Sequence, residues 1–600
     1  MSENNSEIES LIGKIESAHK SGSFKNYIEY IRFPFYKNLE LNSKVEFDFP
    51  LTVMVGPNGS GKSSALQGIY GMPEGFSPGH FWFSTKVDPI ADDDNNRHCL
   101  IYGYKGDDDD EIVEVLKTRI GEAKGSHYWE PSRPLKKYGM KTLKGARNPT
   151  VKKNVVYLDF RSALSAYDRF FYFSNFKTTK TFKSKQDLVS GLSKHLKHSI
   201  DNGLEKKHYS RKISKPIILS KQELDAVNKI LEKDYIECKL INHNLYSKEE
   251  GLTIYFKTKD INYSEAFAGR GEFAVVKLVH EIMKAEQYSL IILDEPEVSL
   301  HPGAQEKLLE FLLKQTLEKK LQIVIATHSE KFLLHLPEKS IKLYFHTKGI
   351  RFGIQNRCHY LEAFKFIGHK ITPSDKKMIY VEDILAKYIL DKILEDLNNE
   401  FPIMFEVKYL PGGVEDLKKR TSGFSQENEA NKFIILDGDK TKPKIDPSLL
   451  TVKESGTFKE LDKKIKEIIG MDFNSLGFSI DSKGTSGGDG KQKIELSLKY
   501  LSYVFSHLDY FPNNKIPEDI IWDTDYANDI LKTAHISSTA FTNDNKENIY
   551  HFTKLYTDDQ TDASYKTCCK LFVKEFVRKK GVDYTEIVNI LNRFKAITVD

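Results

Sequence analysis

The sequence predicts an α/β protein built from two domains, and three observations support this prediction. First, the chain has 600 residues, which exceeds the usual size of one compact domain. Second, apolar runs that read as buried strands, at 51–55, 290–293 and 322–329, alternate with helix-like stretches such as 304–320. Third, a polar stretch at 369–377 separates these segments from two further apolar runs. We therefore expect a largely parallel, doubly wound sheet, followed by a second α/β domain.

Composition narrows the class of protein. Hydrophobic residues make up 40% of the chain before its 36 glycines are counted, which allows sizeable cores and excludes a mostly disordered chain. Mean hydropathy is -0.47, and no apolar run approaches the roughly 18 residues that span a bilayer. The first ten residues are polar and acidic, unlike a secretory signal, and the five cysteines form no CxxC pair. We expect a cytoplasmic protein with no membrane partner.

A long region of weaker pattern interrupts the first domain. Residues from about 90 to 260 contain a strand-like run at 154–160 and helix-like runs at 188–198 and 221–231, without the sustained heptads of a coiled-coil arm. We predict that this region is an insertion of helical and mixed character. The first domain then covers residues 1–368, and the second covers 369–600.

The strongest motif follows the first buried strand. Residues Gly56 to Ser63 read GPNGSGKS and fit the pattern GxxxxGK[ST] in full, with a strand before the motif and a helical pattern after it. The glycines let backbone N–H groups curl around phosphates, Lys62 supplies a charge for the β- and γ-phosphates, and the Ser63 hydroxyl can bind Mg²⁺. This motif predicts an ATP site whose cofactor contacts come from Asn58, Gly59, Gly61, Lys62, Ser63 and Ser64.

Polar residues at the ends of two later strands complete the nucleotide site. Asp294 and Glu295 close the run LIILDE, and we expect Asp294 to hold Mg²⁺ and Glu295 to orient or deprotonate the attacking water. His328 ends the run IVIATHS and is expected to contact the γ-phosphate region. Acids at a strand end can instead be helix caps, and a histidine can instead be a hydrogen-bonded core residue. The phosphate loop favours the catalytic interpretation of all three.

These segments resemble the head of ABC-type ATPases, in particular the branch shared with DNA-repair and recombination ATPases. The resemblance rests on GPNGSGKSS, DEPEVSLHP and ATHSEKF and covers roughly residues 25–345. It implies that two heads enclose two ATP molecules and that each head lends a signature loop to its partner's nucleotide. The matching segment here is FAGRGE, where Ala268 or Gly269 replaces the usual serine and where Gly269 and Gly271 are the expected phosphate contacts. For the aromatic residue that stacks on adenine, the candidates are Tyr30, Phe33, Phe35 and Tyr36.

A second set of acids follows the two apolar runs of the second domain. Glu382 ends the run MIYVE, and Asp437 and Asp439 end the run FIILDGD. The carboxyl ends of neighbouring parallel strands meet at one edge of a sheet, where open α/β sheets bind their ligands. Carboxylates at this edge suit Mg²⁺ or Mn²⁺, and two such ions can cleave a phosphodiester bond. The alternative is that Asp-Gly simply marks a turn.

This second set resembles a Toprim domain, the metal-binding fold of topoisomerases, primases and certain nucleases. An ABC-type head followed by a Toprim domain and a helical C-terminal part resembles the overcoming-lysogenisation-defect (OLD) family of ATP-coupled nucleases. The resemblance implies ATP and Mg²⁺ or Mn²⁺ as cofactors, DNA as substrate and a homodimer or higher homo-oligomer formed through the heads. It also implies a role in bacterial anti-phage defence, in some members beside a retron reverse transcriptase and its nucleic acid.

The resemblance is incomplete at several positions. Asp383 stands where the family usually has glycine, and Ala386 and Lys387 follow it. The second acid of the family motif is therefore either absent or Asp383 itself. A later family acid, which would also bind metal, corresponds to Glu518, Asp519 or Asp523, and we assign it to Glu518. The helical lysine of the family corresponds to Lys570 or Lys574.

The leading hypothesis is therefore an ATP-hydrolysing, divalent-metal-dependent DNA nuclease. Its metal-binding residues would be Ser63 and Asp294 in the first domain and Glu382, Asp437, Asp439 and Glu518 in the second. The alternative is an ATP-dependent nucleic-acid sensor or clamp whose Toprim domain does not cleave. A net charge of only +4 does not by itself indicate a nucleic-acid partner. A topoisomerase or primase is disfavoured, because no DNA-gate tyrosine can be located and a head of this type gives no reason to expect polymerisation.

Overall fold

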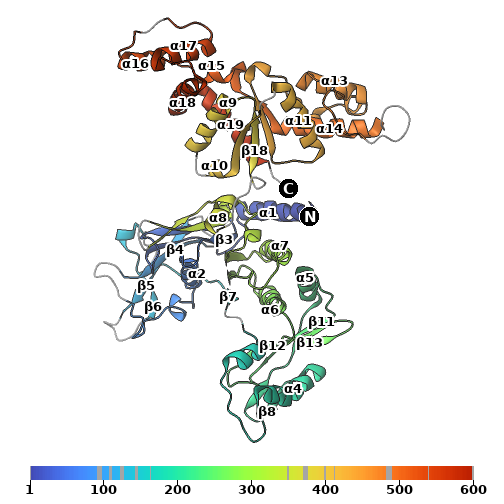
Figure 1. Cartoon of the computed structure of the whole chain (residues 1–600). Helices are drawn as coiled ribbons and strands as arrows, with labels where there is room; N and C mark the ends of the chain where they lie inside the picture. The colour runs from blue at the N-terminus through green and yellow to red at the C-terminus, as the bar shows by residue number, and fades with distance from the viewer. Residues whose placement is uncertain are drawn as a thin grey trace. The chain divides into compact units, whose positions relative to one another are not determined.

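The chain divides into two compact units, Met1–His369 and Lys370–Asp600 (Figure 1). The computed structural model describes residues 2–90, 97–106, 111–121, 128–141, 146–161, 164–347, 351–368, 376–397, 400–410, 413–480, 490–537 and 540–597. Most of the predicted linker, residues 369–375, lies outside the described residues, and Lys377 already belongs to a strand. Among the helices that the structure describes, none combines the length and hydrophobicity that crossing a bilayer requires.

The first unit is built around a sheet of six strands. In spatial order these are β17 (Phe352–Gln355), β16 (Ile341–His346), β3 (Leu51–Val55), β15 (Gln322–Ala326), β14 (Leu290–Asp294) and β7 (Val155–Asp159). All neighbours are parallel except β16 and β17. Every residue of β3, β14 and β15 is buried, as expected of apolar strands covered on both faces. The parallel sheet predicted from these runs is thus present.

An antiparallel sheet corrects the predicted extent of the insertion. Its spatial order is β2 (Ser43–Glu46), β1 (Ile28–Phe35), β4 (Cys99–Lys105), β5 (Ile112–Ile120) and β6 (Tyr128–Ser132). Because β4 pairs with β1 and β7 joins the central sheet, the strands β4 to β7 are integral to the head. The expected insertion of residues 90–260 therefore starts too early. The sequence pattern missed this because an antiparallel strand pairing between distant segments leaves no local signal.

The true insertion is a lobe that leaves the central sheet after β7 and returns before β14 (Figure 1, green). Its strands are β8 (Lys206–His208), β9 (Arg211–Ile213), β10 (Ile217–Ile218), β11 (Glu237–His243), β12 (Gly251–Lys257) and β13 (Asn262–Ser264). Its helices are α3 (Ala166–Asp168), α4 (Lys185–Asn202) and α5 (Lys221–Leu231). Apolar residues of α4, spaced three or four apart, pack with Ile213, Ile241 and Leu245 into a separate core. The lobe thus has a hydrophobic core of its own.

Five further helices belong to the first unit. They are α1 (Ser2–Lys20), α2 (Lys62–Tyr70), α6 (Arg270–Lys284), α7 (Pro302–Lys319) and α8 (Tyr360–Phe366). The start of α7 is fixed by Pro302 in its first turn and by the His301 side chain, which accepts a hydrogen bond from the Ala304 N–H. Helix α2 begins directly at the end of the phosphate loop, so the loop and the helix N-terminus form one structure.

The second unit contains a four-stranded sheet in which all neighbours are parallel. Its order is β19 (Phe405–Tyr409), β18 (Lys377–Val381), β20 (Lys432–Leu436) and β21 (Leu508–Tyr510). The first helices of this unit are α9 (Ile384–Asp396), α10 (Glu400–Met404), α11 (Gly413–Gln426), α12 (Val452–Ser455), α13 (Phe458–Ile469) and α14 (Gly490–His507). A helical part follows the sheet, with α15 (Pro517–Ile521), α16 (Thr524–Thr533), α17 (Asn545–Thr557), α18 (Asp562–Lys579) and α19 (Val582–Ala596).

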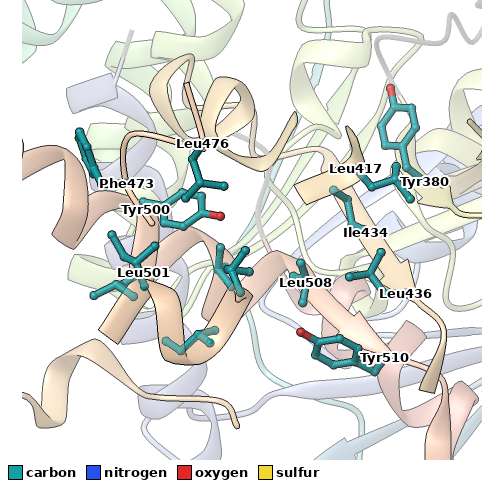
Figure 2. Packing of buried hydrophobic residues seen from close by; sticks show 14 of the residues in the cluster. Tyr380, Leu417, Ile434, Leu436, Phe473, Leu476, Tyr500, Leu501, Leu508 and Tyr510 are labelled. Atoms are coloured by element: carbon teal, nitrogen blue, oxygen red, sulfur yellow. The ribbon is translucent and has the colours of Figure 1, made fainter. Parts of the chain in front are cut away.

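One hydrophobic cluster fixes α13 and α14 against this sheet. Figure 2 shows Tyr500 and Leu501 of α14 in the same cluster of buried side chains as the strand residues Leu436 and Leu508. All four side chains are almost completely buried. The Tyr500 hydroxyl lies 2.8 Å from the Thr421 hydroxyl of α11, so the buried polar group has a partner. This packing holds β18 and β20 side by side, with their carboxyl ends at the same edge.

A buried lysine joins the start of β18 to the end of α19. The Lys377 ammonium donates hydrogen bonds to the backbone carbonyls of Phe594 (2.8 Å), Lys595 (2.7 Å) and Ile597 (2.5 Å). Burial lowers the pKa of Lys377 to about 8. The carbonyls at a helix end have no partners within the helix, so this side chain caps α19 while its own charge is stabilised.

Candidate functional site

The phosphate loop adopts a conformation that only glycine tolerates at two positions. Gly56 has φ 155°, and a Cβ atom there would clash with the Tyr344 carbonyl oxygen. Gly61 has φ 91° and stands directly before α2, where a Cβ would press on Leu39. Both positions are therefore closed to larger residues. The loop can turn sharply between β3 and the N-terminus of α2, which attracts anions.

The loop lysine is held inside its own loop. Lys62 donates hydrogen bonds to the carbonyl oxygens of Gly56 (2.8 Å) and Pro57 (3.0 Å). Burial lowers the pKa of Lys62 to about 8, partly offset by the negative charges of Glu295 and Asp294. A triphosphate would supply negative oxygens in place of these neutral carbonyls and would restore the full charge of the ammonium.

A cavity of about 980 Å³ opens over the phosphate loop and collects most of the predicted nucleotide residues. From the predicted set it is lined by Asn58, Gly59, Gly61, Lys62, Ser63, Ser64, Glu295 and His328. The aromatic ring in its wall is Trp82, whereas Phe33 and Tyr36 are fully buried. The ammonium of Lys37 lies 5.0 Å from the Trp82 ring centre. Among the aromatic residues that the structure describes here, Trp82 is thus best placed to stack on a base, and the sequence pattern did not indicate it.

Asp294 is paired with an arginine that the sequence analysis missed. Its side chain is 1% exposed and accepts a 2.7 Å hydrogen bond from the Arg161 guanidinium. Arg161 also donates to Asp159 at 3.2 Å and lies 3.5 Å from the Ser63 hydroxyl. Asp159 and Asp294 are register partners at the ends of β7 and β14. The guanidinium therefore lies between the two groups, Ser63 and Asp294, that are expected to bind Mg²⁺.

Replacing this arginine should make the first unit depend on magnesium. In Arg161→Ala, Asp294 would keep its buried charge without a cation, and burial already raises the pKa of Asp294. We expect the head to lose about 1–2 kcal/mol of stability without Mg²⁺, since half of the Arg161 side chain is solvated, and to regain most of it with Mg²⁺. Calorimetric unfolding with and without Mg²⁺ tests this, with the head transition identified by its shift with ATP. Equal magnesium effects on wild type and variant would contradict the assignment.

Glu295 and His328 face each other beside the phosphate loop. His328 Nε2 lies 3.9 Å from Glu295 Oε1, and burial lowers the pKa of His328, with the nearby Lys62 adding to the effect. The backbone N–H of His328 donates a 2.7 Å hydrogen bond to Glu297, which fixes the histidine loop. The arrangement presents a carboxylate that can take a proton from water and a neutral imidazole that can donate a hydrogen bond to a phosphate oxygen.

The two predicted signature glycines have different environments. Gly269 is exposed and caps α6, and its N–H donates to the Glu272 carboxylate at 2.7 Å. Gly271 is buried, and a Cβ there would lie 2.5 Å from the Ser299 carbonyl oxygen. Neither glycine lines the cavity over the phosphate loop of its own chain. Gly271 therefore serves the packing of α6, and only Gly269 is accessible to a phosphate.

The acids of the second unit lie at one edge of its sheet. Glu382 directly follows β18 and Asp437 directly follows β20, and these strands are parallel neighbours. Asp439 comes two residues later, in a short turn. The turn requires glycine between the two aspartates, because a Cβ on Gly438 would lie 2.5 Å from the Lys515 nitrogen. The DGD sequence thus reflects close packing as well as charge.

Electrostatic coupling shows that these carboxylates act on one another. Burial, together with the negative charges of Asp383, Glu382, Asp439 and Glu518, raises the pKa of Asp437 to about 8. The pKa of Glu382 is likewise raised by burial and then by Asp383. Because these partly buried carboxylates repel one another when ionised, the group favours the binding of a proton or another cation.

Two carboxylate oxygens in this group lack partners. Among the described residues, Glu382 Oε2 and Asp437 Oδ1 are buried without a hydrogen bond. The other acids are engaged: Asp383 accepts from the Ala386 N–H at 2.7 Å, and Asp439 pairs with Lys440. Within the described part of the chain, no group of three or more histidine, cysteine, aspartate or glutamate side chains is arranged to hold a metal ion.

Glu518 differs from the two other acids considered for its role. It is 6% exposed on α15, 3.5 Å from the Tyr565 hydroxyl, and its pKa is raised by burial. Asp519 accepts a hydrogen bond from Asn545, and Asp523 caps α16 and pairs with Lys579. Of the three, only Glu518 contributes to the raised pKa of Asp437.

The lysines whose charges act on Glu382 are Lys440 and Lys418, and neither is one that the sequence indicated. Lys570 and Lys574 are exposed on α18, and the Lys570 ammonium lies 4.7 Å from the Tyr388 ring centre. Lys418 on α11 is half-buried, burial lowers its pKa, and its positive charge acts on Glu382. The only signal in the sequence is the pair of lysines in EDLKKR, which looks like an ordinary solvated helix face.

Comparisons with known proteins concern the first unit. Residues 51–334 match a family described as "AAA domain, putative AbiEii toxin, Type IV TA system", which is a little under half of the chain. No curated protein matches.

Similar solved structures include an Smc head bound to the C-terminal winged-helix domain of ScpA, with 16% identity, 55% of this chain and 97% of that chain covered, and a TM-score of 0.33. An Smc head with an extended coiled coil, bound to the C-terminal domain of ScpA from Pyrococcus furiosus, has 15% identity, 56% and 98% coverage, and a TM-score of 0.33. The SMC head domain from Thermotoga maritima has 15% identity, 55% and 98% coverage, and a TM-score of 0.28. TM-scores this low do not define the fold of this chain. The family match, which contains the phosphate loop, Asp294 and His328, shows that the first unit carries an ATPase-type AAA domain.

Proposed function

We propose that the chain is an ATP-hydrolysing, divalent-metal-dependent DNA nuclease of the OLD type that acts in bacterial anti-phage defence. In this proposal the second unit is a Toprim-like nuclease domain. The observation that carries it is the group of coupled carboxylates at the edge of the parallel sheet, with buried, partnerless oxygens on Glu382 and Asp437. A buried carboxylate oxygen without a donor is costly, and a cation is the partner that removes the cost.

The two partnerless oxygens of Glu382 and Asp437 fit Mg²⁺ or Mn²⁺, which prefer oxygen ligands. Glu382 and Asp437 would hold the ion, and Asp439 and Glu518 would have to turn toward it to complete the ligand set, since the described side chains form no ready group of three. When bound, the metal would lower the pKa of a coordinated water and stabilise the charge on the leaving oxygen. Lys418, whose positive charge acts on Glu382, would neutralise a phosphate oxygen of the DNA strand.

The first unit would control this site through ATP. Lys62 binds the phosphates, Glu295 takes the proton of the attacking water, and His328 donates to the γ-phosphate. Gly269 stands at the exposed N-terminus of α6 and is absent from the cavity of its own chain. A second copy of the chain would therefore supply this helix end to the nucleotide, so a homodimer would form on ATP binding.

The nuclease is tested by incubating the purified chain with plasmid and linear DNA in Mg²⁺, Mn²⁺ or EDTA. We expect nicking or degradation with metal and none with EDTA. The double variant D437A/D439A should leave the DNA intact, whereas D416A/E427A, which removes two exposed acids from the same unit, should cleave normally. Equal residual DNA with wild type and D437A/D439A would refute the nuclease.

One observation favours a second candidate, an ATP-dependent nucleic-acid clamp that does not cut. No metal-ready group of acids is present among the described residues, and Asp383 is used to cap α9. The clamp would bind DNA without loss of substrate under any metal or nucleotide. Retained binding together with intact DNA in every condition would support the clamp, and metal-dependent cleavage would exclude it.

A further inference from the structure

The insertion lobe contains a second cavity, which the proposed nuclease does not use. It has a volume of about 820 Å³, within the usual range of ligand sites. Aromatic rings from several elements form much of its wall, contributed by Tyr167, Phe171, Tyr246, Tyr255, Tyr263 and Phe267. Tyr167 and Phe171 are stacked with ring centres 5.1 Å apart, and Phe267 is 88% exposed. The cavity thus offers flat apolar surfaces that are open to a ligand.

A series of buried, hydrogen-bonded polar side chains ends at the wall of the same cavity. Glu265, 7% exposed, lines the cavity and accepts hydrogen bonds from the Thr253 hydroxyl (2.9 Å) and the Ile254 N–H (3.1 Å). The Thr253 oxygen lies 2.8 Å from His243 Nε2, which is also buried. Burial raises the pKa of Glu265 to about 7. A carboxyl group fixed in an aromatic wall can accept a hydrogen bond from a ring-bound amino group.

One of the segments that line this cavity is strongly basic in sequence. Residues 164–219 contain twelve lysines and arginines but four aspartates and glutamates, a net charge of +8, whereas the whole chain carries +4. Lys194 and Lys197 line the cavity itself. In the described part of the chain, Lys177, Lys180, Lys183 and Lys194 form no ion pair, and all four are exposed. Of these four, Lys194 lines the cavity, so the described part of the lobe presents an unpaired cation at the aromatic wall and three more in the segment before α4.

We propose that this cavity binds an unpaired nucleobase of a nucleic-acid strand, with the base between tyrosine rings and the strand's phosphates on the lysines of α4 and the preceding loop. Aromatic platforms beside a basic groove are the common means of holding single strands. A lipid surface or an acidic peptide would use the lysines but gain nothing from a carboxyl group in the wall. A duplex would keep its bases stacked and out of reach.

The proposal goes beyond the nuclease and does not depend on it, because the cavity lies in the insertion lobe and uses none of the carboxylates at the second unit's sheet edge. The test therefore contains EDTA, which prevents metal-dependent cutting, and no ATP. A fluorescent single-stranded oligonucleotide of about twelve nucleotides with one 2-aminopurine reports binding by anisotropy and base stacking by quenching. We expect binding that quenches the 2-aminopurine and weakens as salt is raised.

Variants of the cavity separate base stacking from simple charge attraction. Tyr255→Ala should weaken binding about tenfold and abolish the quenching, and Tyr255→Phe should retain both. Tyr167→Ala, which removes a ring from another element of the wall, should act in the same way if Tyr255→Ala disturbs the lobe. K194A/K197A should weaken binding and flatten its dependence on salt, whereas K221A/K233A, at two exposed positions that do not line the cavity, should bind like wild type.

Three results would overturn the proposal. The first is equal affinity and quenching for wild type, Tyr255→Ala and Tyr167→Ala. The second is equal binding of a matched duplex with no response of the 2-aminopurine. The third is binding to vesicles of anionic lipid that exceeds binding to the oligonucleotide, which would assign the basic surface to a membrane. If the second unit proves unable to cleave DNA, these three binding measurements keep their meaning, because none of them depends on cleavage.

Discussion

Glu295→Gln is expected to slow ATP hydrolysis by at least ~10²-fold while ATP still binds. The substitution keeps the size and shape of the side chain but removes the carboxylate that faces His328 over the phosphate loop. Glu295 has φ 56°, so a residue of the same shape avoids added strain at this position. Because the phosphate contacts are intact, the variant should retain ATP and remain in its ATP-bound state. Phosphate release under saturating ATP, together with equilibrium binding of labelled ATP, measures both effects.

Two further variants show whether an effect of Glu295→Gln is specific to the nucleotide site. Lys62→Ala should weaken ATP binding itself, because it removes the buried ammonium that faces the triphosphate. Glu318→Gln, an exposed acid near the end of α7, should leave binding and hydrolysis unchanged. Normal hydrolysis in Glu295→Gln and Lys62→Ala would show that the nucleotide is processed elsewhere.

Asp437→Asn is expected to reduce metal-dependent DNA cleavage by ~10²-fold or more and, at the same time, to stabilise the metal-free second unit at alkaline pH. The loss follows from removing a ligand oxygen. The gain follows because desolvation and the neighbouring carboxylates raise the pKa of Asp437 from 3.8 to about 8. The folded state therefore binds more protons than the unfolded state between these values, so wild-type stability falls as pH rises from about 4 to 8.

This pairing of effects distinguishes a ligand-binding carboxylate from a structural one. Unfolding in EDTA at pH 5 and pH 8.5 should show a pH-dependent loss of stability in wild type and a much smaller loss in Asp437→Asn. Adding Mn²⁺ at pH 8.5 should stabilise the wild type and have little effect on the variant. A variant that is less stable than wild type at both pH values would indicate that Asp437 holds the fold together, not a metal.

The features that could be predicted from the sequence are those encoded by neighbouring residues. The strand, loop and helix around Gly56 to Ser63 form one local unit, so the motif also predicted the shape of the loop. Glu382 and Asp437 were predicted to meet because each ends an apolar run and parallel strands align such ends. The strand predicted at 154–160 is present as β7, but its place in the central sheet was not foreseen.

The features that could not be predicted depend on pairings across long stretches of chain. Arg161 reaches Asp294 only because β7 and β14 are neighbours, although 133 positions separate the two residues. Trp82 and Lys418 stand in segments whose local patterns are those of a loop and a solvated helix. The predicted start of the insertion was wrong for the same reason, since β4 pairs with β1, which lies far from it in the sequence. The local residue pattern of one sequence does not show which distant segments pair with each other.

The three hydrogen bonds of Lys377 have a consequence for how the protein is made. An ammonium buried at the start of β18 is stable only when the carbonyls of residues 594–597 are present, and leaving it without them would cost about 3–5 kcal/mol. During translation, the strand that carries Glu382 leaves the ribosome more than 200 residues before its last partner. A nascent or prematurely terminated chain would thus have an unfinished second unit, so the activity proposed for that unit would be withheld until residue 597 has been synthesised.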